Sequence, residues 1–331
     1  MHRDERPLSR YGDPALAQTL EDVLGSRHRV AAGATVTRGG IRVASLGAGV
    51  EADFEIGSVS KCITGMLYAD ALSRSEIEMT TTLGDALDIG PCPAARVRLQ
   101  DLSTHRSGLP RLPLSAVSLG RAWGYWRHGA NPYGDSLAQL LQQAREVAVG
   151  RPRPRYSNFG YELLGHALAG VAGTTYTELA RTRVIEPLGL SSTYAPATAK
   201  DLRPTAVAGS RRGRPMQPWV GGAIAPAGGW RSSIADMARL AAALLDGSAP
   251  GVAALDPVAD LAGPAVRIGA AWVTVHRGGR QITWHNGGTG GFRSWIGLDR
   301  DAGNAVVLLS ATAASVDRHG FTLLLQPQRS T

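Results

Sequence analysis

The sequence predicts an α/β (α+β) protein in which one antiparallel sheet, built from both ends of the chain, carries an inserted and mostly helical unit. Strand-like segments gather near both ends, at residues 30–47 and 266–310, and helical patterns dominate between them. One sheet covered by helices is the simplest arrangement of such segments. We therefore expect a sheet unit from residues 1–90 and 225–331, and a helical inserted unit from residues 91–224.

The first segments predict a helix and then a β-hairpin. Apolar residues recur at helical spacing over about residues 14–24. Two strand-like runs follow, at residues 30–37 and 41–47, and the Arg-Gly-Gly sequence at residues 38–40 is typical of a tight turn. A second helix is expected to start at about residue 58 and to end at about residue 73.

The rest of the chain predicts helices first and strands last. Amphipathic patterns place helices at residues 136–147, 161–172, 176–185 and 234–245. Five strand-like runs follow, at residues 266–269, 271–275, 281–285, 292–298 and 305–310. The glycine-rich segment 286–291 predicts a turn between two of these strands, and a closing helix is expected from residue 315 onward.

The composition narrows the possible partners. The chain has a formal net charge of +8 and a pI near 10.0. Arginines cluster at residues 151–155 and 211–214, but aromatic residues make up only 6% and no nucleic-acid-binding motif is present. We therefore expect a solvated basic surface and no specific nucleic-acid partner. No run of 18 or more apolar residues occurs, so we expect no membrane span.

The N-terminus and the cysteines bear on location and cofactors. Residues 1–7 are charged and lack the apolar stretch of a secretory signal, so the sequence predicts a cytoplasmic protein. Cys62 and Cys92 are too few for a disulfide framework or a thiolate metal site. We recognise no nucleotide-binding loop and no metal-ligand motif, and therefore expect no cofactor and no metal. No sequence feature indicates the oligomeric state.

A nucleophile and a base are suggested where the second helix begins. Ser58 and Lys61 form a Ser-x-x-Lys pair, and positions i and i+3 share one face of a helix. A serine nucleophile needs a neighbouring base, and a lysine acts as one only when burial lowers its pKa. Lys61 is one of two lysines in the chain, Lys200 being the other, and lysine can lose its proton whereas arginine cannot. Taken alone, the pair is better explained by Ser58 capping the helix and Lys61 facing solvent.

Two later segments supply compatible groups. Tyr156 and Asn158 lie in a loop before a predicted helix. A phenol shuttles protons when nearby cations hold its pKa down, and an amide both donates and accepts hydrogen bonds. The run His285-Asn286-Gly287-Gly288 follows a predicted strand. A backbone N–H there, together with that of Ser58, would form an oxyanion hole.

The three motifs together resemble the serine β-lactamase and penicillin-binding-protein superfamily, on the branch of class C β-lactamases, DD-peptidases and related esterases. Residues 54–61, Phe-Glu-Ile-Gly-Ser-Val-Ser-Lys, are similar to its Ser-x-x-Lys motif, and residues 156–161, Tyr-Ser-Asn-Phe-Gly-Tyr, to its Tyr-x-Asn motif. The tripeptide at residues 285–287 stands where the family has Lys/His-x-Gly. The resemblance covers about residues 30–310, and three motifs in the same order are far more specific than one.

The resemblance implies a role for each motif residue. Ser58 would be the acylated nucleophile, and Lys61 would take its proton or tune the site. Tyr156 would be a general base and the acid toward the leaving group, and Asn158 would position Lys61 and the substrate. His285 would line the substrate side beside Asn286 and Gly287, and the N–H groups of Ser58 and Gly288 would form the oxyanion hole. We expect His105 to be structural, with its ring bonded to backbone near the site.

The resemblance implies a serine hydrolase that cleaves an ester or amide bond of a small molecule or peptide through an acyl-enzyme. Most β-lactamases have lysine where this chain has His285, and a histidine is largely neutral near pH 7. This difference favours esterase, peptidase or acyl-transfer chemistry over efficient β-lactam hydrolysis. Two alternatives stay open: an acyltransferase of secondary metabolism, and a penicillin-binding protein with slow turnover.

Overall fold

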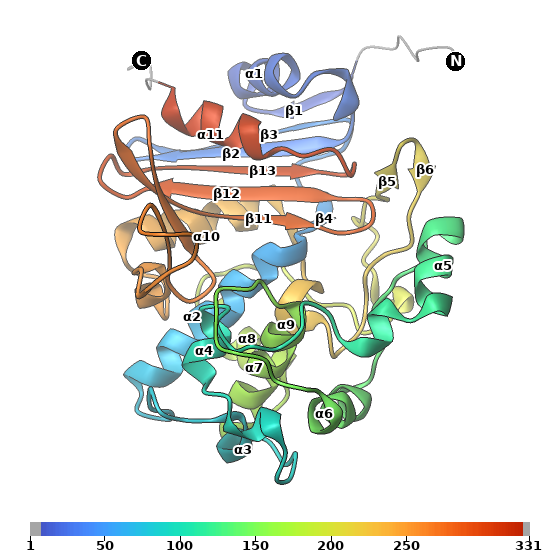
Figure 1. Cartoon of the computed structure of the whole chain (residues 1–331). Helices are drawn as coiled ribbons and strands as arrows, with labels where there is room; N and C mark the ends of the chain where they lie inside the picture. The colour runs from blue at the N-terminus through green and yellow to red at the C-terminus, as the bar shows by residue number, and fades with distance from the viewer. Residues whose placement is uncertain (1–7, 327–331) are drawn as a thin grey trace.

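A nine-stranded antiparallel sheet forms the upper half of the molecule in Figure 1. The computed structural model describes residues 8–326, so the charged segment behind the prediction of a cytoplasmic protein lies outside the described residues. The strand order is β1-β3-β2-β13-β12-β11-β10-β9-β8. These strands are Arg10–Gly12 (β1), Ala31–Thr37 (β2), Gly40–Leu46 (β3), Ala259–Asp260 (β8), Val266–Ile268 (β9), Val273–Arg277 (β10), Arg280–Gly288 (β11), Arg293–Asp299 (β12) and Asn304–Ser310 (β13).

The centre of the sheet joins the two ends of the chain. Strand β2 pairs with β13, and Ala34 lies opposite Val307. Every strand of this sheet falls within residues 1–90 or 225–331, so the predicted fold class is confirmed. Two small ribbons lie outside it: Asp53–Glu55 (β4) with Arg231–Ser233 (β7), and Ser210–Arg211 (β5) with Arg214–Pro215 (β6). The division into two units at residues 90 and 224 stays a prediction.

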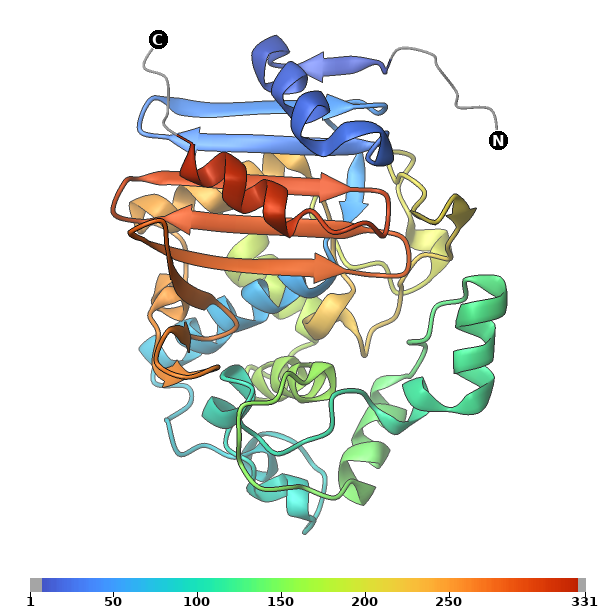
Figure 2. The ribbon, with the colours of Figure 1, turned by 45° about the horizontal axis from the view of Figure 1, so that its top comes forward.

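Helices cover both faces of the sheet. The α-helices are Pro14–Leu24 (α1), Ser60–Ser73 (α2), Leu83–Ala86 (α3), Leu99–Ser103 (α4), Leu119–His128 (α5), Leu137–Glu146 (α6), Asn158–Val171 (α7), Tyr176–Ala180 (α8), Ala225–Gly228 (α9), Ile234–Asp246 (α10) and Asp317–Leu325 (α11). The helix expected to continue to residue 185 does so as a π-helical turn, Arg181–Ile185. Helices α1 and α11 lie on the outer face of the sheet, in front of it in Figure 2, and α10 lies on the opposite face.

Strand β13 shows why both faces are covered. Its side chains alternate, so that Val306 and Leu308 join the apolar cluster under α1 and α11. Val307 and Leu309 join the larger cluster on the other face. Successive residues of a strand point to opposite faces, and a strand that is apolar throughout must therefore be buried on both.

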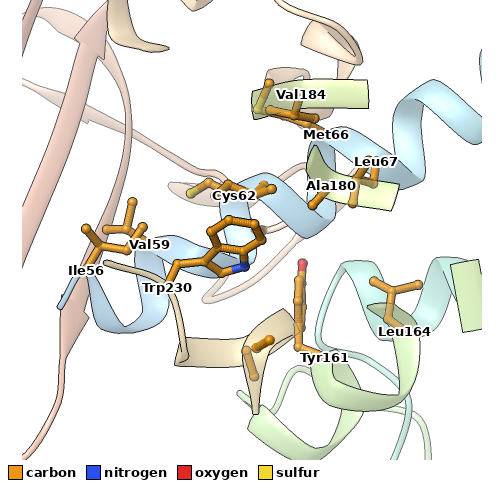
Figure 3. Close-up of a cluster of buried hydrophobic side chains, with 14 of the residues drawn as sticks. Ile56, Val59, Cys62, Met66, Leu67, Tyr161, Leu164, Ala180, Val184 and Trp230 are labelled. Atoms are coloured by element: carbon orange, nitrogen blue, oxygen red, sulfur yellow. The ribbon is translucent and has the colours of Figure 1, made fainter. Parts of the chain in front are cut away.

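Helix α2 runs through the larger core and is buried on almost every side. Eleven of its 14 residues are buried. Figure 3 shows Cys62 and Met66 of α2 among apolar side chains of neighbouring segments, Trp230 and Val184 included. A Cβ atom at Gly65 would lie 2.2 Å from the carbonyl oxygen of Ala270, so the helix touches neighbouring backbone directly. Cys62 is fully buried in this core.

Helix α5 has the opposite character. None of its ten residues is buried, and it stands apart at the right of Figures 1 and 2. Leu119 and Trp123 are 91% and 66% exposed. The helix begins after the capping side chain of Ser118 and ends at Gly129, whose φ of 66° is the left-handed conformation favoured by glycine.

Candidate active site

The nucleophile segment is a tight turn at the start of α2. Ser58 lies in the 3-10 turn Gly57–Val59, and the α-helix begins two residues later than the sequence predicts. The turn follows from Gly57, whose φ is +50° and whose Cβ atom, if it had one, would lie 2.6 Å from the nitrogen of Gly288. Only glycine allows this approach of two backbones. The Ser294 hydroxyl donates to the carbonyl oxygen of Ile56 at 2.6 Å and ties the turn to β12.

Lys61 is completely buried beside Ser58. Its Nζ atom donates to Ser58 Oγ at 3.2 Å and to the carbonyl oxygen of Ala227 at 2.5 Å. Burial lowers the pKa of Lys61 to about 7, although the Glu162 carboxylate opposes this shift. The alternative of a solvent-facing Lys61 is therefore wrong. An amine that is neutral for much of its population near pH 7 is able to accept a proton from the adjacent serine.

Tyr156 lies over the same amine. The Nζ atom of Lys61 is 4.9 Å from the centre of its ring, and the Arg111 guanidinium is 5.4 Å from it. Burial raises the pKa of the Tyr156 phenol, while its hydrogen bond with Ser58 and the charge of Arg111 oppose the rise. Desolvation outweighs the nearby cations, so they do not hold the pKa of this phenol down. The phenol keeps its proton near neutral pH.

Asn158 begins α7 and faces a tyrosine. Its Nδ2 atom donates to the Tyr133 hydroxyl at 2.7 Å. Its buried Oδ1 atom accepts no hydrogen bond from the part of the chain that the structure describes. We expected Asn158 to hold Lys61, but the hydrogen bonds that the structure gives Lys61 go to Ser58 and Ala227. Buried acceptors are normally paired, so an amide oxygen without a partner among residues 8–326 is unusual.

The strand after His285 continues where a turn was expected. Strand β11 extends through Gly288, and the turn follows it. The N–H of Thr289 donates to the carbonyl oxygen of Phe292 at 3.1 Å, and hydrogen-bonded and non-bonded residue pairs alternate along an antiparallel ladder. Gly288, opposite Arg293, therefore belongs to a non-bonded pair. Its N–H points away from β12, on the side where Gly57 packs.

His285 is buried beside the site. Its side chain is 4% exposed, and its Nδ1 atom is 2.6 Å from the carbonyl oxygen of Asn286. It is not among the residues that line the cavity, and its place on the substrate side stays a prediction. Burial and the charge of Lys61 lower its pKa to about 4, so the ring is neutral near pH 7. His105 accepts a hydrogen bond from the Ser157 backbone N–H at 3.2 Å, which confirms its predicted structural role.

A cavity of about 510 Å³ opens above these groups. Six residues singled out in the sequence line it, namely Ser58, Tyr156, Asn158, Asn286, Gly287 and Gly288. The Nδ2 atom of Asn286 donates to Asp317 at 2.8 Å, which fixes its side chain on the cavity wall. The structure thus gathers residues from three distant segments around one serine hydroxyl.

The comparison with known proteins agrees with this geometry. The family model described as Beta-lactamase matches residues 16–326. The chain belongs to the beta-lactamase family. The resemblance inferred from the three motifs is confirmed.

The relatives and solved structures that resemble this chain share at most about a third of its residues, and not all of them are named beta-lactamase. The D-alanyl-D-alanine-carboxypeptidase/endopeptidase AmpH of Escherichia coli (strain K12) is 30% identical over 151 residues, which are 43% of this chain and 37% of that protein. The chain spans less than half the length of the curated relatives it matches. A class C beta lactamase from Rhodobacter sphaeroides has a TM-score of 0.75 at 22% identity, over 91% of this chain and 95% of that one. The Beta-Lactamase/D-Alanine Carboxypeptidase from Pseudomonas syringae has a TM-score of 0.79 at 16% identity, over 95% and 100%.

Several residues of this beta-lactamase-family site carry no motif in the sequence analysis. Arg111, Tyr133, Trp219 and Arg293 also line the cavity. Tyr133 and Trp219 come from irregular segments, where no periodic pattern marks a residue that faces a cavity.

Glu162 is a further group that the sequence reasoning missed. It lies on α7, is 1% exposed, and its Oε1 atom has no hydrogen-bond partner among residues 8–326. Burial raises its pKa and the charge of Lys61 opposes the rise. A signal was available, because a carboxylate between Tyr161 and Leu163 interrupts the apolar stripe of that helix.

Residues 8–326 contain neither a metal-binding cluster nor a membrane-spanning helix. Between residues 8 and 326, no cluster of three or more His, Cys, Asp or Glu side chains is able to hold a metal ion. No helix within the same range has the length and apolarity needed to cross a membrane.

Proposed function

We propose that this chain is a serine hydrolase that cleaves an ester or amide bond of a small molecule or peptide through an acyl-enzyme on Ser58. The observation that carries the proposal is the hydrogen bond of 3.2 Å between Ser58 Oγ and the Nζ atom of Lys61, whose pKa burial lowers to about 7. Membership of the beta-lactamase family supports the same reaction class. The names of relatives, a carboxypeptidase/endopeptidase among them, support an acyl group as the part transferred.

The first half of the reaction forms the acyl-enzyme. Neutral Lys61 takes the proton of Ser58 as Oγ attacks the substrate carbonyl carbon, and the resulting oxyanion faces the N–H groups of Ser58 and Gly288. Tyr156, whose pKa burial raises, donates its proton to the departing nitrogen or oxygen as that bond to carbon breaks. The ammonium of Lys61 then returns a proton to Tyr156.

The second half releases the acid. A water molecule attacks the acyl carbon and gives a proton to Lys61, and the bond between the acyl carbon and Ser58 Oγ breaks as Oγ regains a proton. Asn158 lines the cavity and contacts the acyl part of the substrate there. Neutral His285 is buried beside the site and leaves the cavity without the lysine charge common in the third motif, which favours esters and peptide-type amides over β-lactams.

Intact-mass measurement tests the proposal. The wild-type protein and Ser58→Ala would be incubated with p-nitrophenyl acetate and, separately, with benzylpenicillin. We expect a covalent adduct on the wild type and none on Ser58→Ala. Ser60→Ala is the matched control, because this buried serine lies two residues away and we expect its variant to keep the adduct.

The fate of the adduct separates the remaining possibilities. A short-lived acetyl adduct with release of acetate supports hydrolysis, whereas an adduct consumed faster by an added amine than by water indicates acyl transfer. A penicilloyl adduct that persists for hours, with no ester turnover, indicates a slow penicillin-binding protein. An adduct that forms equally on Ser58→Ala, or none on the wild type with either reagent, would overturn the proposal.

A further inference from the structure

An apolar recess of about 370 Å³ lies beside the catalytic cavity. None of its lining residues is charged: they are alkyl and aromatic side chains from the segment at residues 112–117, from α5, from residues 132–133 and from Trp219. Nothing in the proposed chemistry uses this space. The acylation steps need the groups around Ser58, which lies in the neighbouring cavity.

The recess adjoins the catalytic cavity. Four residues line both of them, namely Leu112, Tyr125, Tyr133 and Trp219. A chain attached to Ser58 would reach the recess by passing these four side chains. This adjacency favours a part of the substrate as the occupant over a separate molecule.

The polar atoms on the recess wall are already engaged or covered. The Tyr125 hydroxyl accepts a hydrogen bond from Arg211 at 2.9 Å, and the Tyr133 hydroxyl accepts one from Asn158 at 2.7 Å. The indole nitrogen of Trp219 is buried away from solvent. The recess thus presents ring faces and alkyl groups, which favour a ligand without hydrogen-bonding groups.

We propose that the recess binds a hydrocarbon chain on the acyl side of the substrate, so that the enzyme selects acyl groups much longer than acetyl. The inference rests on the proposed function and narrows its substrate class. The acyl side follows from Tyr133, which walls the recess and holds Asn158, the residue assigned to the acyl part. Each methylene transferred from water into such a recess improves binding about fourfold.

A chain-length comparison tests the inference. The ratio of kcat/KM for p-nitrophenyl octanoate to that for p-nitrophenyl acetate would be measured in one preparation, so that it does not depend on the fraction of folded enzyme. We expect the wild type to favour the octanoate ester at least tenfold. We expect Ala122→Trp to lower this ratio at least tenfold, because Ala122 of α5 lines the recess and not the catalytic cavity.

Leu119→Trp is the matched control. It adds the same indole to the same helix at a position that is 91% exposed, and we expect the ratio to stay within twofold of the wild-type value. A wild-type ratio near one would overturn the inference, and so would an unchanged ratio in Ala122→Trp.

A binding measurement separates failure of the recess from failure of the proposed function. Sodium octanoate and sodium acetate would be titrated calorimetrically into Ser58→Ala, with and without Ala122→Trp. Octanoate that binds at least tenfold more tightly than acetate, and loses this advantage in Ala122→Trp, would support the recess even if the wild type hydrolysed no ester. Ester turnover without chain-length preference, together with equal binding of the two acids, would overturn the recess and leave the hydrolase proposal standing.

Discussion

Helices α2 and α5 contribute to the same region of the molecule in opposite ways. Helix α2 is buried along almost its whole length and holds the Lys61 amine away from the surface. Helix α5 has no buried residue, yet it supplies Tyr125 to both the cavity and the recess. The difference teaches that the reactive groups and the groups that select the substrate can rely on very different amounts of packing.

The physical reason lies in what each helix must hold. Burying an amine is unfavourable, and only a rigid surrounding core keeps Lys61 buried beside Ser58. A recess wall needs only apolar surface in roughly the right place, so a helix held by few contacts is sufficient. One such contact is Arg211 of β5, whose guanidinium stacks 4.5 Å from the centre of the Trp126 ring.

Replacing Lys61 of α2 is expected to have the largest effect on activity. Lys61→Met keeps an unbranched side chain in the core but removes the base, so we expect kcat/KM for p-nitrophenyl acetate to fall by about 10²–10⁴-fold. Lys200→Met is the matched control, since Lys200 is exposed and is the only other lysine of the chain, and its activity should stay within twofold. A Lys61→Met variant that folds and retains a tenth of the activity would refute the assigned role.

Substitutions in the buried helix α2 should cost more free energy of unfolding than substitutions in the exposed helix α5. Met66 of α2 is fully buried, and Met66→Ala is expected to lower the free energy of unfolding by about 2–5 kcal/mol. Trp123 of α5 is 66% exposed, and Trp123→Ala should change it by less than about 0.5 kcal/mol. Chemical denaturation measures both. A cost above 2 kcal/mol for Trp123→Ala would mean that α5 packs against something absent from the single chain.

The pH dependence of activity tests whether Lys61 of α2 is the base. Lys61 accepts a proton only when neutral, and its pKa is lowered to about 7, so kcat/KM should rise about tenfold per pH unit below pH 7 and level off above it. His285 does not produce this rise, because its pKa is lowered to about 4. A profile for p-nitrophenyl acetate that is flat between pH 5.5 and pH 8.5 would contradict a lysine base.

A smaller effect on activity is expected at the contact that holds α5. Arg211→Ala removes one cation–π contact and one hydrogen bond near the surface, so the free energy of unfolding should fall by about 1 kcal/mol or less. The preference for octanoyl over acetyl esters should nevertheless fall several-fold, because Tyr125 and Trp126 lose the group that positions them. Arg42→Ala, which removes an exposed charge on β3, controls for net charge and should leave both values unchanged.

Much of the fold and part of the site can be predicted from the sequence. Strand and helix periodicity places the sheet at the two chain ends, because burial imposes a regular pattern on each element. The proximity of Ser58 and Lys61 follows from their spacing at the start of a helix. The sequence also places Gly288 at a position of β11 whose N–H points away from β12.

The other features of the site depend on contacts between distant segments, which no local sequence pattern encodes. The raised pKa of Tyr156 reflects how many neighbours exclude water from it, and these come from several segments. The burial of His285 depends on strand register, where one residue reverses the face. The place of Trp219 in the cavity depends on an irregular segment, and loop paths carry no periodicity.

The hydrogen bond between Ser294 and Ile56 has a consequence for synthesis in the cell. The two residues are 238 positions apart, so the nucleophile turn leaves the ribosome long before the strand that fixes it exists. Contacts between such distant residues form late and slowly. A growing chain that ends before β12 therefore carries Ser58 and Lys61 without the contact that ties their turn to the sheet.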